Sequence, residues 1–103
     1  MATNVLFEKY RLIMQKIPYQ SLLRETKYNL FGLIQCIEQG PNEDKYPNYK
    51  VHVKDLYYKW VAWRNYTIQL QARAWKTNGD FQELAMLEYI RVAHTYLCHL
   101  QLL

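Results

Sequence analysis

Hydrophobic residues recur along this chain at intervals of three and four positions, which is the spacing of one face of an α-helix. The pattern predicts four helices, at about residues 4–16, 18–39, 50–77 and 80–102. Pro18 interrupts the first helical pattern, and Gly40-Pro41 and Asn78-Gly79 end the second and third, as such residues commonly do. We therefore expect an all-α fold, a compact four-helix bundle that forms a single domain over residues 1–103.

The third predicted helix holds all three tryptophans of the chain. Its apolar residues form a central line of Leu56, Trp60, Trp63, Thr67, Leu70 and Ala74, and a second line beside it of Tyr57, Val61, Ile68 and Trp75. Together they cover an arc of about 180°, whereas an ordinary surface helix needs only about 100° of apolar stripe. This width predicts that the helix is central in the bundle and covered on more than one side.

Two polar residues, Arg64 and Gln71, lie one heptad apart inside this apolar arc. A buried guanidinium or amide without a partner costs about 2 kcal/mol or more. The sequence leaves three interpretations open. Arg64 extends along its methylene groups to the rim of the arc, the pair sets the register of an oligomer or partner interface, or it has a catalytic role.

The opposite face of the same predicted helix is basic and aromatic, with Tyr58, Lys59, Tyr66, Arg73 and Lys76. Residues 49–76 carry a net charge of +5, against +4 for the whole chain. Lysine and arginine bind nucleic-acid phosphates, and tyrosine rings stack on unpaired bases. Nucleic-acid binding through this face is therefore the alternative function that the sequence offers.

Three further positions lead to local predictions. Gly32 lies inside the second predicted helix but off its apolar stripe, which indicates a close approach of another helix near Cys36. Asp80 followed by Glu83 forms a capping box, so the fourth helix should begin there. Glu88 is interpreted as a surface charge.

Hydrophobic residues make up half of the chain and aromatic residues 16% of it, so the chain should fold. Leu84 and Leu87 lie on the outer face of the fourth predicted helix. Together with the wide arc of the third helix, they amount to more apolar surface than four helices hide comfortably. We therefore expect a partner surface, with a homodimer as the first expectation and a heterologous protein partner as the second.

No apolar run approaches the about 20 residues that a membrane span requires. The first ten residues lack the pattern of a secretory signal. We accordingly expect a cytoplasmic protein that has no membrane segment. In that setting Cys36 and Cys98 should both be reduced.

Candidate catalytic chemistry is sparse. His94, Cys98 and His99 fall within six residues, and His94 and Cys98 share a helical face as metal ligands would. A structural zinc site takes four ligands, however, and only Cys36 and His52 remain to complete one. The three glycines are isolated, and no histidine adjoins a serine or an acid in a recognisable catalytic pattern. We therefore expect no metal, no cofactor and no enzymatic activity.

These observations favour a small non-enzymatic helical protein-interaction module that self-associates. The predicted interaction residues are Trp60, Trp63, Arg64, Gln71, Trp75, Leu84 and Leu87. Tryptophan, tyrosine and arginine dominate the energetics of protein interfaces, which supports this choice. The residues predicted for the alternative, nucleic-acid binding, are Tyr58, Lys59, Tyr66, Arg73 and Lys76.

Overall fold

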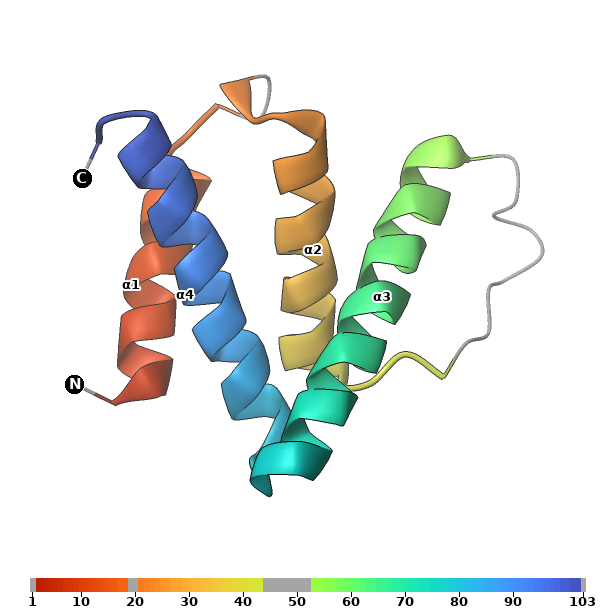
Figure 1. Ribbon diagram of the computed structural model, residues 1–103. Coiled ribbons are helices and arrows are strands. Elements are labelled where there is room, and N and C mark those ends of the chain that lie inside the picture. The colour runs from red at the N-terminus through yellow and green to blue at the C-terminus, as the bar shows by residue number, and fades with distance from the viewer. Residues whose placement is uncertain (1, 19–20, 44–52, 103) are drawn as a thin grey trace.

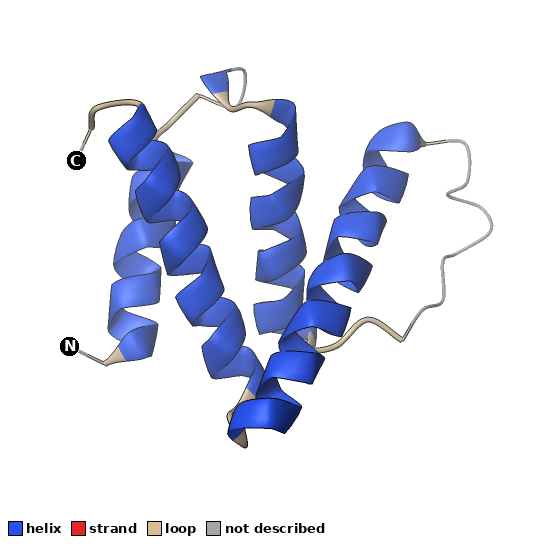
Figure 2. Cartoon of the chain, in the orientation of Figure 1, coloured by secondary structure: helices blue, strands red, loops and turns tan. Residues whose placement is uncertain are grey.

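The structure is a computed structural model that describes residues 2–18, 21–43 and 53–102. Its elements are α1 (Thr3–Gln15), α2 (Arg24–Gln39), α3 (Lys54–Thr77) and α4 (Phe81–His99). The fold is the all-α four-helix bundle that the sequence predicts (Figure 1). Figure 2 shows helices and loops and no strand over the described residues.

Helices α2 and α4 are the central pair of the bundle. Figure 1 shows α2 between α3 and α4, and α1 against α4 on the side away from α3. Helix α3 packs mainly on α2 and meets α4 near the turn that joins them, from which the two helices diverge. The prediction that the tryptophan-rich helix is central was therefore wrong.

The second helix begins at Arg24, six residues after the predicted start. Leu23 is in an extended conformation, with φ −62° and ψ 142°, so it precedes the helix and does not belong to it. Just before it, Tyr96 of α4 donates a hydrogen bond from its hydroxyl to the Ser21 carbonyl at 2.9 Å. This contact connects the α1–α2 segment to the end of α4. The predicted start of the third helix, at about residue 50, lies outside the described residues, and α3 begins at Lys54.

The predicted end of α3 and start of α4 are confirmed. Asn78 takes the left-handed conformation with φ 53°, which is common directly after a helix. Asp80 then accepts a hydrogen bond from the Glu83 N–H at 2.9 Å. In place of the second half of a capping box, the Glu83 carboxylate accepts a hydrogen bond from the Thr3 hydroxyl at 3.1 Å, which links the starts of α4 and α1.

Gly32 marks a close helix crossing, as the sequence predicts. A Cβ atom at this position would lie 2.7 Å from the Ala62 carbonyl carbon and 2.8 Å from the Trp63 backbone nitrogen. Only glycine allows the α2 and α3 backbones to approach this closely. The crossing fixes which side of α3 faces α2.

The hydrophobic core comes chiefly from α2 and α4, with contributions from α1 and α3. Its buried members include Phe7, Met14, Leu30, Leu33, Cys36, Ile37, Leu70, Ala85, Tyr89, Ala93, Tyr96 and Leu97. Phe7 of α1 contacts the Tyr89 ring of α4 edge-on, with the ring centres 5.1 Å apart. Both cysteines are free: Cys36 is buried in this core and Cys98 is exposed.

Candidate interaction surface

The central apolar line of α3 faces the bundle, as predicted. Thr67 and Leu70 are buried, and the other four residues of the line are half-buried. Of the 24 residues of α3, only Ala62, Thr67 and Leu70 are buried. The helix therefore contacts the rest of the protein through a narrower strip than its apolar arc implies.

Hydrogen bonds hold this line against the end of α2. Trp63 donates from its indole Nε1 to the Gly40 carbonyl at 2.9 Å. The Thr67 hydroxyl donates to the Trp63 carbonyl at 2.8 Å and accepts from the Asn42 N–H at 2.9 Å. These bonds satisfy buried polar groups, so they fix α3 in one rotation about its axis.

The second apolar line of α3 faces away from the bundle. We call it, together with the two polar residues that it flanks, the outer stripe: Tyr57, Val61, Arg64, Ile68, Gln71 and Trp75. Trp75 is 88% exposed, Ile68 57% and Tyr57 45%. The prediction that the whole arc is covered was wrong at these positions. The contact side of α3 therefore consists of the central line and the side that carries Tyr66, not the side that carries Ile68 and Trp75.

Arg64 and Gln71 are exposed rather than buried. The Arg64 guanidinium lies over the Trp60 ring, 5.9 Å from its centre, at a distance typical of a cation–π contact. The Trp60 ring stacks on Tyr57 with their centres 6.4 Å apart. Arg64 therefore follows the interpretation in which its side chain reaches the rim of the arc, and it joins the aromatic surface of the stripe.

The third line of α3, Lys59, Tyr66 and Arg73, was predicted to face solvent. This prediction was wrong for Lys59 and Tyr66, which are half-buried, whereas Arg73 is exposed. Lys59 is half-buried, pairs with Asp55 at 3.1 Å and lies 4.6 Å from the centre of the Phe31 ring. Tyr66 packs against the core, and burial raises its pKa. These cationic and aromatic groups are therefore engaged within the protein.

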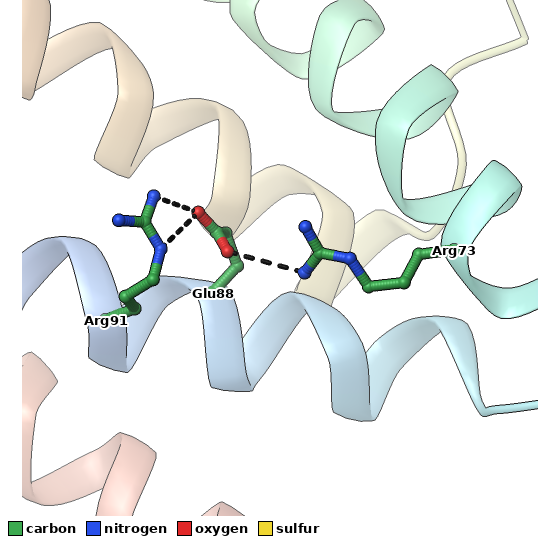
Figure 3. A network of polar contacts seen from close by, with 3 residues as sticks. All are labelled: Arg73, Glu88 and Arg91. Atoms are coloured by element: carbon green, nitrogen blue, oxygen red, sulfur yellow. Dashed lines mark hydrogen bonds and ion pairs between the residues drawn. The ribbon is translucent and has the colours of Figure 1, made fainter. Parts of the chain in front are cut away.

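Arg73, the third member of that line, is part of a charged cluster between α3 and α4 (Figure 3). Its Nη1 lies 3.5 Å from Oε2 of Glu88, and the Arg91 guanidinium binds Oε1 of the same carboxylate, with Nε at 2.9 Å. Hydrogen bonding from Arg91 in the first place, and then from Arg73, lowers the Glu88 pKa although burial opposes the shift. Glu88 is only 8% exposed, so its interpretation as a surface charge was wrong.

Three members of the predicted nucleic-acid face, Tyr58, Arg73 and Lys76, are exposed. Tyr58 is 38% exposed and has the Arg24 guanidinium 4.8 Å from its ring centre. Lys76 is exposed in the last turn of α3. Tyr58 and Lys76 lie on opposite halves of the helix, and Lys59 and Tyr66 of the line between them are half-buried. The structure therefore does not bring the five predicted residues together as one open surface.

The two predicted leucines of α4 differ in environment. Leu84 is half-buried and packs against the core, whereas Leu87 is 46% exposed. An open hollow of about 550 Å³ lies at the C-terminal end of the outer stripe. It is lined by Pro41, Gln71, Ala74, Trp75, Asn78 and Phe81. Sequence reasoning missed Pro41 and Phe81, because only the fold brings the α2–α3 connection and the start of α4 beside Trp75.

His94 and Cys98 share a face of α4 as predicted, with Nε2 and Sγ 3.5 Å apart, and the Tyr10 hydroxyl lies 2.7 Å from Nδ1 of His94. Cys98 is exposed. Over the described ranges, no three or more histidine, cysteine or acidic residues gather as metal ligands would. His52 lies outside these ranges.

The helices of the described residues include none with the length and hydrophobicity needed to cross a bilayer. The fold and the outer stripe are thus the observations from which a function can be argued. Comparison of the chain with protein-family models, curated proteins and solved structures found no match.

Proposed function

We propose that this protein is a non-enzymatic protein-interaction module that docks the outer stripe of α3 against another protein surface, in the first place a second copy of itself. The observation that carries the proposal is the exposure of Trp75, 88%, in line with Ile68 and Tyr57 on one helix face. Exposed apolar residues are ordinary when they are scattered, but several of them aligned on one helix face are typical of a binding surface.

The chemistry of the stripe supports the same function. Tryptophan, tyrosine and arginine are the residue types enriched among those that contribute most to binding free energy. The stripe has one of each, in Trp75, Tyr57 and Arg64, and a hollow adjoins Trp75. A partner residue that filled this hollow would cover the indole ring on its open side.

The stripe is also held in place before any partner binds. The opposite side of α3 is fixed by the Gly32 crossing, by the hydrogen bond from the Trp63 indole to the Gly40 carbonyl, and by the one from the Asn42 N–H to the Thr67 hydroxyl. A helix face held in this way loses little conformational freedom on docking, which lowers the entropic cost of association. The α3 scaffold is therefore suited to present the stripe as a rigid ridge.

The proposal predicts that the solution mass rises with concentration from the 12.5 kDa of one chain toward twice that value. Sedimentation or light scattering over a concentration series measures this directly. Ile68→Ser should shift the midpoint of association to at least about 10-fold higher concentration, since 1.4 kcal/mol of lost binding energy corresponds to that factor.

The matched control is Leu12→Ser on α1, because Leu12 and Ile68 are equally exposed at 57%. This variant should associate as the unmodified protein does. A mass that stays at 12.5 kDa at every concentration, or an equal effect of the two substitutions, would contradict the proposal that the stripe mediates self-association.

A further inference from the structure

We infer that the outer stripe pairs with the outer stripe of a second copy in antiparallel orientation, around a two-fold axis level with Tyr66. This inference rests on the proposed function and adds the partner's orientation and register. Successive residues of the stripe are four and three positions apart in alternation. That alternation is the a and d pattern of a coiled-coil seam, which pairs with another helix.

The residue types of the stripe are complementary to themselves when one copy is reversed. Tyr57 then lies opposite the partner's Trp75, Val61 opposite the partner's Gln71, and Arg64 opposite the partner's Ile68. Each level of the seam thus pairs two aromatic side chains or an aliphatic side chain with a polar one.

Charge also favours the antiparallel arrangement. In a parallel pair, Arg64 of each copy would lie at the same level, and the stripe contains no carboxylate to separate the two cations. In the antiparallel pair the two arginines are offset along the axis by about 6 Å, at 1.5 Å per residue. Each then lies one helical turn from the partner's Gln71, whose amide oxygen accepts hydrogen bonds.

The area of the stripe is sufficient for a specific dimer of modest affinity. At 45% and 88% exposure, Tyr57 and Trp75 together present roughly 300 Å². Two copies would bury about 600 Å² from these rings alone, which is half of the about 1,200 Å² at the lower end of specific interfaces. Val61, Ile68 and the polar pair supply the remainder. We therefore expect association in the micromolar range.

Oxidative cross-linking tests the register. Cys98→Ser removes the exposed native thiol, and Cys36 is buried, with a pKa that burial raises to about 11. In this background, Val61→Cys and Gln71→Cys are prepared separately and then mixed before oxidation. The antiparallel pair places each cysteine about 15 Å from its own copy across the axis but directly opposite the other variant's cysteine.

A covalent dimer should therefore form in the mixture and not in either variant alone, and Leu12→Cys should form none. Cross-linking of Val61→Cys or Gln71→Cys alone, as strong as in the mixture, would overturn the inference in favour of parallel pairing. Sedimentation of the same reduced samples separates the two proposals. A dimer that gives no cross-link in the mixture refutes the register alone, whereas a monomer at all concentrations refutes the proposed function as well.

Discussion

Trp63 and Trp75 lie on the same helix, yet the protein places them in opposite environments. Trp63 is half-buried against the core and donates its indole N–H to the Gly40 carbonyl. Trp75 is 88% exposed. Because the two residues have the same side chain, hydrophobicity alone does not decide which of them is covered.

The difference follows from how α2 and α3 cross. Gly32 allows the backbone of α2 to lie directly against Ala62 and Trp63 of α3. Once that contact is made, the adjoining Lys59 and Tyr66 pack inward, and the outer stripe is turned to the open side. One close approach of two backbones thus outweighs a broad arc of apolar side chains in setting the rotation of the helix.

The sharpest test of this comparison replaces each tryptophan with alanine. Trp63→Ala should lower the free energy of unfolding by about 3 kcal/mol, because it leaves a cavity beside the core and removes a hydrogen bond. Trp75→Ala should change the stability of the monomer by less than about 0.5 kcal/mol. Urea unfolding at a concentration that keeps the protein monomeric measures both. Equal losses would show that the two indole rings are equally buried in solution.

Gly32→Ala should be the next largest change. Alanine in the middle of a helix normally stabilises it by up to about 1 kcal/mol relative to glycine. Here the new methyl group would meet the backbone of Ala62 and Trp63, so a loss of about 2 kcal/mol is expected. Gly79→Ala is the control, since its Cβ would meet only side-chain atoms of Thr77 and Leu84. A stabilised Gly32→Ala variant would mean that the helices do not cross this closely.

Glu88→Gln should have the smallest effect, about 1 kcal/mol at neutral pH, because the arginines that it releases are largely exposed and can be hydrated. The folded-state pKa of Glu88 is lowered, so the carboxylate contributes stability that is complete above its unfolded pKa of about 4.3. That contribution is lost as the pH falls through the lower folded-state pKa.

The difference in melting temperature between Glu88→Gln and the unmodified protein should accordingly be full above about pH 5 and shrink below about pH 4. Glu8→Gln is the control, since Glu8 is exposed and lies 3.9 Å from Arg11. Its effect should stay below about 0.5 kcal/mol. A Glu88→Gln difference that does not change with pH would show that the charged form of Glu88 makes no contribution.

Much of the fold can be predicted from local chemistry. The turn at Asn78 and the cap at Asp80 depend on residues within a few positions of each other, so both boundaries follow from the sequence. Gly32 likewise indicates a helix crossing before its partner is known. The start of α2 was predicted wrongly because Pro18 permits a helix start, whereas Tyr96 of α4 holds the following segment through Ser21.

The candidate site was predicted in part. Of the interpretations of Arg64, the one in which its side chain reaches the rim of the arc agrees with the structure, whereas the exposure of Gln71 was not predicted. The Glu88–Arg91 spacing of three residues is visible in the sequence, yet the approach of Arg73 that helps to bury Glu88 depends on how α3 meets α4. The hydrophobic periodicity of a single helix does not predict its contacts with helices that are distant in the chain.

The sequence by itself determined the number of helices, the residue types on each face of α3 and the position of the close crossing, because these depend on periodicity and on neighbouring residues. The tertiary structure alone decided which face of α3 is covered. Which face is covered depends on the difference in free energy between packing one side of α3 against α2 and packing another side of α3 there. It was settled by backbone contact at Gly32 and by hydrogen bonds to Gly40 and Asn42, none of which a single helix contains.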